Sequence, residues 1–369
     1  MSRILKLILV AGARPNFMKV APLIHAARRH NADVSAATRF DCRLVHTGQH
    51  YDDAMSEVFF RELGIPKPDV NIGVGSGSHA AQTGGVMIGF EKVCLEEKPD
   101  WVVVFGDVNS TMACALVAVK LGVRVAHVEA GLRSFDRTMP EEINRVVTDA
   151  IADLLLTPSE DGNENLRREG VPETRICLVG NIMIDSLVAN LEQARRSSIL
   201  QQCGVQPGNY LYVTLHRPAN VDDRTSLTAI AGELKRLAAT MPVVFPVHPR
   251  TRKMFSEFGI QLNGEDGCRL LEPVGYHDSV CLTENARLVL TDSGGLQEES
   301  TYFRTPCLTL RPNTERPVTI TEGSNRLTKV STLAADLNQV LAASPRLGRL
   351  PALWDGKTSE RILAALSGS

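Results

Sequence analysis

The chain has 369 residues, 43% of them hydrophobic, and its 40 basic and 42 acidic residues give a formal net charge of −2. At roughly 100–200 residues per domain this length predicts two domains, and the apolar content is ample for two packed cores. The charge balance lacks the basic surplus that nucleic-acid-binding proteins show, so we expect no nucleic-acid partner.

No apolar run approaches the roughly 18 residues of a membrane-spanning helix, so we expect no membrane association. The apolar start, residues 4–10, contains Lys6 and ends in Gly-Ala-Arg-Pro, which favours a buried first strand over a signal peptide. The eight cysteines are scattered, without a C-x-x-C pair or a zinc-ligand spacing. We therefore expect reduced thiols, a cytoplasmic protein and no metal site.

Short apolar runs alternate with helix-like segments along the chain. Strands are expected at residues 5–10, 42–46, 101–105, 123–128, 154–157, 176–179, 210–215, 242–246, 270–272, 288–291 and 307–310. These runs lack strict polar alternation, which is typical of parallel strands covered on both faces, and the strand–helix alternation favours doubly wound α/β sheets. Eleven strands are too many for one compact sheet of this kind. We therefore expect two sheets, divided near residues 175–190.

This division predicts a first Rossmann-like domain at residues 1–178 and a second at 179–350. The remaining segment, 351–369, is expected to pack back on the first domain. Its helix is predicted at residues 351–366. The glycine-rich stretch at 73–78 does not follow a convincing strand, so we interpret it as a surface loop rather than a phosphate cradle.

In open α/β sheets, ligands bind at the carboxyl ends of the strands. The first strand ends near Arg14, which can present a planar fork to a phosphate; the alternative is a solvated loop arginine. The strand at 101–105 leads to Asp107, which either faces a ligand or caps the next helix, although Ser110 is as good a cap.

The stretch HVEAGLRSFDRTMPEEINR (127–145) concentrates charge at the end of another strand. A carboxylate such as Glu129 is costly there unless it is paired or functional. A proline suits the first helical position, and Glu141 and Glu142 then fall in the first turn, where the helix dipole favours acids. Dipole compensation and an i,i+4 pair between Glu141 and Arg145 explain the helix start but not Glu129.

Two strands of the second half end in histidines, His216 and His248. Another strand end carries Ser293–Gly295 before a helix, where bare N–H groups and the positive end of the dipole can bind a phosphate. A carboxylate three or four residues into that helix could reach a ribose diol. Together these features predict a nucleotide diphosphate on the second domain, with the acids of the first domain across a cleft.

Taken in order, the motifs resemble those of the non-hydrolysing UDP-N-acetylglucosamine 2-epimerases over nearly the whole chain. The matching motifs are GARPNFMKVAPL (12–23), HTGQHYD (46–52), GDVNST (106–111), HVEAGLRS (127–134), MPEEINR (139–145), VGN (179–181), LHRPAN (215–220), VHPRT (247–251) and DSGGLQEE (292–299). This resemblance implies the glycosyltransferase-B architecture, in which two Rossmann-like domains face a central cleft.

The resemblance also implies an isomerase that interconverts UDP-GlcNAc and UDP-ManNAc without NAD or metal. In that family UDP is eliminated from C1 as the C2 proton leaves, which gives a 2-acetamidoglucal, and UDP then adds back with inverted C2. The alternatives are a hydrolysing relative that releases UDP and free ManNAc, a glycosyltransferase, and a nucleotide-sugar binding module.

By resemblance, Asp107, Glu129 and Glu141 are the candidate acid/base set and His216 is a fourth catalytic group. The candidate UDP-binding residues are Arg14, His248, Ser293, Gly294, Gly295 and Glu299, with Arg14 on the diphosphate and Glu299 on the ribose. Arg145 is expected in the substrate site, where it orients the acids. Gln49 and His50 match a region through which some members bind a second UDP-GlcNAc as activator, but no matching arginine stands near Gln82.

Other residues of the charged stretch are expected away from the chemistry: Glu142 at the dipole or in solvent, Asp136 and Arg137 on the loop surface, and His127 inside a strand. The sequence Gly-Ala-Arg-Pro-Asn replaces the commoner Gly-Thr-Arg-Pro-Glu. Related epimerases of UDP-2,3-diacetamido-glucuronic acid share the ARPxF and MPEEINR forms, so a modified UDP-sugar is an alternative substrate. A homodimer is expected from the resemblance alone.

Overall fold

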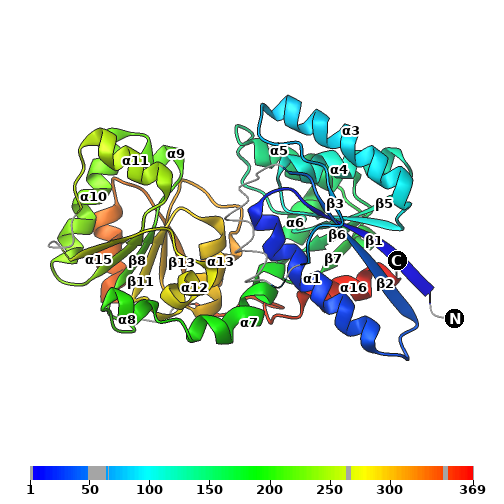
Figure 1. The fold of residues 1–369 in the computed structure, drawn as a ribbon. Coiled ribbons are helices and arrows are strands. Elements are labelled where there is room, and N and C mark those ends of the chain that lie inside the picture. Colours follow the sequence, from blue (N-terminus) through cyan, green and yellow to red (C-terminus); the bar gives the residue numbers. More distant parts are fainter. Residues whose placement is uncertain (1–2, 49–63, 65, 263–266, 344–347, 369) are drawn as a thin grey trace. The chain divides into compact units, whose positions relative to one another are not determined.

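The computed structural model describes residues 3–48, 64, 66–262, 267–343 and 348–368. The chain divides into two compact units (Figure 1). Unit 1 comprises Met1–Ala189 and Ala352–Ser369, and unit 2 comprises Asn190–Pro351. Among the described residues, no helix is both long and apolar enough to span a membrane.

Unit 1 is built on a seven-stranded sheet in the order β3-β2-β1-β4-β5-β6-β7, in which all neighbours are parallel. Its strands are β1 (Arg3–Ala11), β2 (Thr38–His46), β3 (Val70–Asn71), β4 (Trp101–Phe105), β5 (Arg124–Val128), β6 (Leu154–Thr157) and β7 (Ile176–Leu178). The strand order reverses between β1 and β4. Ligands of doubly wound sheets bind at such a switch point, beyond the carboxyl ends of the strands.

Helices cover both faces of this sheet (Figure 1). They are α1 (Arg14–Ala32), α3 (His79–Glu97), α4 (Asn109–Lys120), α5 (Pro140–Ile151), α6 (Glu160–Arg168), the short 3-10 helix η1 (Glu173–Arg175), α7 (Ile182–Arg195), which runs on into unit 2, and α16 (Thr358–Gly368), which packs against α1. The central strand β4 is buried at every position, because helices lie on both of its sides.

Unit 2 has a six-stranded parallel sheet in the order β10-β9-β8-β11-β12-β13. Its strands are β8 (Leu211–Thr214), β9 (Val243–Pro246), β10 (Cys268–Leu271), β11 (Leu288–Thr291), β12 (Cys307–Leu310) and β13 (Asn325–Thr328). Along β11, Leu288 and Leu290 belong to one apolar core and Val289 to another. Alternate side chains therefore enter separate cores on the two faces of the sheet.

The helices of unit 2 carry the remaining candidate residues. They are α8 (Ile199–Cys203), α9 (Pro218–Val221), α10 (Arg224–Ala238), α11 (Pro249–Phe258), α12 (Tyr276–Asn285), α13 (Gly294–Phe303), α14 (Val318–Thr321) and α15 (Leu333–Ala342). The order reverses at β8, which lies between β9 and β11, so the ends of β8 and β11 form a second switch point.

Each predicted strand is present, and the structure adds β3 and β13. The predicted C-terminal helix begins later than expected, at Thr358, because Leu353 and Gly356 adopt positive φ angles of 62° and 77°. The start of α16 is fixed by Asp185, whose carboxylate accepts hydrogen bonds from the backbone N–H groups of Thr358 (3.0 Å) and Ser359 (2.7 Å).

Candidate active site

Glu129 directly follows β5 and has a left-handed backbone conformation, with φ at 72°. Such a conformation in a residue other than glycine costs on the order of 1–3 kcal/mol and is found preferentially at functional sites. The carboxylate is buried, and its Oε2 accepts a 2.6 Å hydrogen bond from Lys19 Nζ of α1. Its Oε1 is also buried and has no hydrogen-bond partner within the described residues. This oxygen therefore has an unused acceptor position.

Lys19 is a site residue that the sequence reasoning did not single out. It lies within the matched motif 12–23, but nothing in the local pattern indicates that its buried ammonium pairs with Glu129, a residue 110 positions away. The pair offsets two buried charges that would each be costly alone.

Asp107 lies in the turn 106–108 between β4 and α4, which we call the Asp107 turn. A Cβ atom on Gly106 would stand 2.7 Å from Lys19 Nζ and 3.4 Å from Glu129 Oε2, so this turn packs directly against the Lys19–Glu129 pair. Asp107 Oδ2 accepts hydrogen bonds from Arg145 Nε (3.0 Å) and Nη2 (2.6 Å). The structure thus brings Asp107, Glu129 and Arg145 to one edge of the sheet.

The helix-cap alternative for Asp107 is wrong. Helix α4 begins at Asn109 with Val108, and not Asp107, at the N-cap. Ser110, the other candidate cap, is buried inside the helix, and its hydroxyl is 2.7 Å from that of Thr47. The Asp107 side chain, 29% exposed, is instead held by Arg145.

The sequence predicts Glu142 at the helix dipole or in solvent; it does lie in the first turn of α5, but the solvent alternative is wrong, because Glu142 is 3% exposed. Its carboxylate accepts hydrogen bonds from the N–H groups of Ser134 (2.9 Å) and Phe135 (2.8 Å) and from Arg145 Nη1 (2.5 Å). Glu142 therefore fixes the loop that precedes α5 and supports the arginine that holds Asp107.

Pro140 and Glu141 occupy the first turn of α5, as predicted, and Glu141 is exposed. The predicted i,i+4 pair between Glu141 and Arg145 does not form in the described structure, in which Arg145 pairs with Glu142 three residues before it. The Glu141 carboxylate stays at the surface near the helix start, where it can meet a ligand.

His127 and Arg137 lie where the sequence predicts, inside a strand and on the loop surface. His127 is buried inside β5, and Arg137 is exposed in the loop. Asp136 is half-buried, and its Oδ1 accepts hydrogen bonds from the N–H (3.0 Å) and hydroxyl (2.6 Å) of Thr138, so it shapes the loop.

In unit 2, the fully buried Asp292 follows β11 and anchors His216. Asp292 accepts from the N–H groups of His216 (3.0 Å) and Arg217 (2.9 Å), and its Oδ1 is 2.8 Å from His216 Nδ1. Burial alone would raise the pKa of Asp292, but the hydrogen bond and positive charge of His216 hold it below its usual value. The His216 side chain is 41% exposed, so Asp292 orients an imidazole that a ligand can reach.

His248 is the N-cap of α11, and its Nδ1 accepts a 3.2 Å hydrogen bond from the N–H of Arg250. Its ring centroid lies 5.5 Å from that of His216. Partial burial, together with the positive charge of His216, lowers the pKa of His248. The structure therefore gives His248 a capping role and places it beside His216.

The Ser293–Gly295 turn has the form expected of an anion site. Ser293 is the N-cap of α13 and makes no side-chain cap bond, and a Cβ on Gly295 would meet no atom within 4 Å. A Cβ on Gly294 would stand 3.0 Å from Nη1 of Arg316, a residue that the sequence analysis did not identify. Backbone N–H groups, a helix N-terminus and a guanidinium together form a set suited to a diphosphate.

Arg316 is held in place by two acids. Its Nε donates to Glu298 Oε1 at 2.7 Å, and its Nη1 donates to Glu315. Both glutamates are buried, so the guanidinium has little freedom to leave the turn. The local sequence TER gives no sign of this position, because it depends on how the chain after β12 folds back on α13.

Glu299 lies in α13 and is buried. Burial, and then repulsion from Glu298, raises its pKa to about 8. Burial also raises the pKa of Tyr276, to which the charge of Glu299 contributes, so the two groups share one environment. A carboxyl group in such a site is stabilised by hydroxyl donors, which a ribose would supply.

Three candidate residues lie partly or wholly outside the described structure. Arg14 is the first residue of α1, and its side chain lies outside the described structure, as do Gln49 and His50. Within the described residues, no group of three or more His, Cys, Asp or Glu side chains could hold a metal ion.

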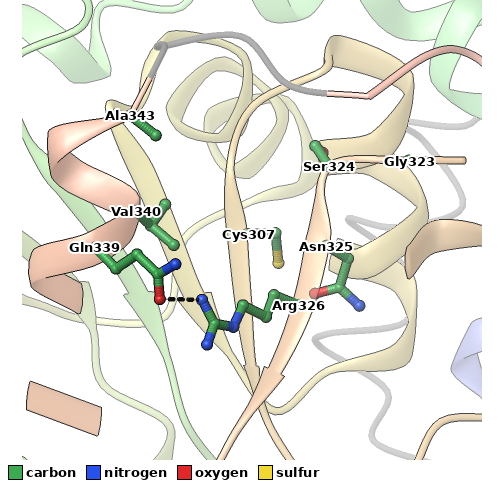
Figure 2. A pocket seen from close by; sticks show the side chains of 8 residues that line it. All are labelled: Cys307, Gly323, Ser324, Asn325, Arg326, Gln339, Val340 and Ala343. Atoms are coloured by element: carbon green, nitrogen blue, oxygen red, sulfur yellow. Dashed lines mark hydrogen bonds between the residues drawn. The ribbon is translucent and has the colours of Figure 1, made fainter. Parts of the chain in front are cut away.

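The pocket in Figure 2 lies away from the candidate residues. It has a volume of about 220 Å³ and lies between β13 and α15, where Arg326 Nη1 donates to Gln339 Oε1 at 2.6 Å. Its lining contains none of the candidate acids, histidines or turn residues. The candidate residues of each unit therefore lie near the switch point of its own sheet and outside this pocket.

The raised pKa of Glu299 leads to a prediction for stability. The unfolded chain loses this proton near pH 4.5, whereas the folded chain keeps it up to about pH 8. Between these values the folded state binds more protons, so this group makes the free energy of unfolding fall as pH rises. Glu299→Gln removes the effect. We expect its melting temperature, relative to the wild type, to rise from pH 5 to pH 9.

The measurement is thermal unfolding of both proteins across that range, with Glu257→Gln, a change at an exposed glutamate of α11, as the control. A constant difference between wild type and Glu299→Gln from pH 5 to pH 9 would contradict the assignment.

Comparison with known proteins places the chain among nucleotide-sugar epimerases. The model of the family "UDP-N-acetylglucosamine 2-epimerase" matches residues 32–367. The UDP-N-acetylglucosamine 2-epimerase of Methanocaldococcus jannaschii is 42% identical over 98% of this chain and 99% of its own. A UDP-2,3-diacetamido-2,3-dideoxy-D-glucuronate 2-epimerase of Pseudomonas aeruginosa is also 42% identical, over 88% of each chain.

Solved structures of the same family resemble this chain over nearly its whole length. The M. jannaschii enzyme in complex with UDP-GlcNAc and UDP superposes with a TM-score of 0.87 and covers 99% of this chain and 100% of that one. The Neisseria meningitidis enzyme bound to UDP-GlcNAc, 27% identical, gives a TM-score of 0.86 over 99% and 100% of the two chains. The expected glycosyltransferase-B-like fold with two parallel sheets is confirmed, and the chain belongs to the UDP-N-acetylglucosamine 2-epimerase family of isomerases.

Proposed function

We propose that the chain interconverts UDP-GlcNAc and UDP-ManNAc by eliminating UDP and adding it back, without net hydrolysis. The observation that carries the proposal is the pairing of Glu129 with Lys19 beside the Asp107 turn, which offers an unpartnered buried carboxylate oxygen for proton transfer. The relative from M. jannaschii, which carries this name, supports the same reaction.

Elimination requires a group that takes the C2 proton and, for inversion, a group that returns a proton to the opposite face. A single acid cannot serve both faces of the sugar ring. We assign the two roles to members of the set Asp107, Glu129 and Glu141. Lys19 offsets the charge of Glu129, and Arg145 orients Asp107 through two hydrogen bonds to one oxygen.

The departing diphosphate gains negative charge as the C1–O bond breaks, and donors that meet this charge lower the barrier. The Ser293–Gly295 N–H groups and Arg316 provide such donors in unit 2, and Arg14 is assigned to the same diphosphate. Glu299 is assigned to the ribose hydroxyls. His216, which Asp292 orients, is assigned as a further catalytic group. His248, beside it, is assigned to UDP binding.

A second candidate substrate follows from the relative in P. aeruginosa. That protein is named for UDP-2,3-diacetamido-2,3-dideoxy-D-glucuronate and has the same 42% identity as the M. jannaschii enzyme, over 88% of this chain against 98%. The C2 chemistry would be the same, so only the C3 and C6 substituents of the sugar separate the two proposals.

We also propose a cytoplasmic homodimer. The exposed apolar side chains of Ile88 and Leu95, 67% and 58% accessible on α3, support a self-association surface. All eight cysteines are free thiols, as in proteins of reducing compartments. Sedimentation equilibrium that returns the mass of a single chain would reject the dimer.

Product analysis tests the reaction directly. Proton NMR of UDP-GlcNAc incubated with the enzyme should show UDP-ManNAc accumulating to a fixed ratio, with no free sugar. Accumulating ManNAc and UDP would favour a hydrolysing enzyme, and turnover only with an added acceptor would favour a glycosyltransferase. Binding with no turnover would favour a binding module. Parallel assays with the diacetamido-glucuronate substrate would decide between the two candidate sugars.

Substitutions test the acid/base assignment. Asp107→Asn, Glu129→Gln and Glu141→Gln should each lower turnover by roughly 10²–10⁴-fold, because each removes a proton-transfer group. Binding of UDP, measured by calorimetry, should stay close to wild type, because the proposed diphosphate site lies in unit 2. Near-normal turnover in all three variants would reject the assignment, and Glu257→Gln serves as the control for a surface glutamate.

A further inference from the structure

Both ring nitrogens of His127 face acceptors. The side chain is fully buried in β5, with Nδ1 2.6 Å from Asp149 Oδ1 and Nε2 2.8 Å from the carbonyl oxygen of Gly106. A carbonyl oxygen can only accept a hydrogen bond. A neutral imidazole has one N–H, so it would point a lone pair at one of these two oxygens.

The partner of Nδ1 is an ionised carboxylate. Burial alone would raise the pKa of Asp149, but the charge and hydrogen bond of His127, and then those of Arg133, hold it below its usual value. Asp149 Oδ2 accepts from the N–H of Gly131 (3.0 Å) and is 2.7 Å from Arg133 Nη1. Donors thus surround this carboxylate, so it has no proton to give to His127.

We propose that His127 is an imidazolium and that, with Asp149, it acts as a positioning pair for the acid/base residues of the epimerase. His127 ties the Gly106 carbonyl, and with it the Asp107 turn, to Asp149. Asp149 also binds Gly131, in the turn that carries Glu129. One buried carboxylate therefore links the two turns whose acids are assigned to the C2 proton, and this role depends on the function proposed above.

Arg133 holds the other oxygen of Asp149. Arg133 pairs with Asp149 and also with Glu169, through Nε–Oε1 at 2.8 Å and Nη2–Oε2 at 2.7 Å. The Glu169 side chain is 37% exposed, so the buried part of this network consists of His127, Arg133 and Asp149.

The Asp107 turn and the turn at 129–131 both contain a glycine with a positive φ angle, and the His127–Asp149 pair is hydrogen-bonded to each of these glycines. Gly106 and Gly131 have φ angles of 64° and 79°, and a Cβ on Gly131 would lie 2.4 Å from the carbonyl oxygen of Gly162. Neither turn has room to relax by a large movement, so losing one hydrogen bond should displace a carboxylate slightly without unfolding the turn. Displacements on the order of 1 Å can lower a rate by about 10²-fold.

The first test measures the protonation of the histidines in the wild-type protein. In wild-type enzyme labelled with ¹⁵N at its nine histidines, one imidazole should keep both ring nitrogens protonated at pH 8, with slowly exchanging ring protons. That signal should persist in His216→Asn and vanish in His127→Asn. If all nine imidazoles are neutral at pH 8, the proposal is wrong, whether or not any variant folds. Since this readout needs no substrate, it is independent of the proposed function.

The second test separates the two bonds. His127→Asn keeps a donor near the Nδ1 position, and His127→Gln keeps one near Nε2, whereas His127→Phe keeps neither. We expect kcat to fall roughly 10- to 100-fold in the Asn and Gln variants and further in the Phe variant, with KM within about threefold of wild type. His30→Gln, at an exposed histidine of α1, is the control.

A folded His127→Phe with wild-type kcat would overturn the positioning role. So would a variant that raises KM while leaving kcat unchanged, because that pattern reports lost binding and not misplaced acids. If the wild-type enzyme turns over no UDP-sugar at all, the proposed function fails, and the ¹⁵N spectrum alone decides the charge of His127.

Discussion

The structure of unit 1 depends on one constraint: carboxylates that are buried or partly buried at the carboxyl edge of a parallel sheet must be matched by cations. Glu129 pairs with Lys19, and Asp107 with Arg145, which in turn pairs with Glu142. Each cation comes from a helix that packs at this edge. The position of the helix therefore determines where the positive charge lies. The strained backbone of Glu129 persists because these contacts determine its side-chain position.

Unit 2 meets a different electrostatic demand. A diphosphate brings its own negative charge, and the unit offers donors to it: the N–H groups of the Ser293–Gly295 turn and the guanidinium of Arg316. Buried acids serve here to orient donors. Asp292 fixes His216, and Glu298 fixes Arg316. Carboxylates thus support other groups in both units, as Glu142 and Asp292 do, whereas the candidate acid/base carboxylates are assigned to unit 1.

The sequence was informative where function depends on position along a strand, and uninformative where it depends on distant contacts. The apolar runs predicted the strands, and their ends pointed to Asp107 and Glu129. Helix logic placed Glu142 at the dipole, yet its burial arises because the loop from Ser134 folds back over it. Lys19 and Arg316 were missed because each acquires its role through a partner far along the chain. Strand β13 was missed because its residues, NRLT, are largely polar.

The central claim is that the C1–O bond to UDP breaks and re-forms while acids in unit 1 move the C2 proton. It is tested most directly with UDP-GlcNAc that carries ¹⁸O in the bridge between C1 and the β-phosphorus. The account predicts that, during turnover, ¹⁸O appears in the non-bridging oxygens of the β-phosphate, because the released phosphate can rotate before UDP adds back. Deuterium entering C2 from heavy water while all the ¹⁸O stays in the bridge would contradict it.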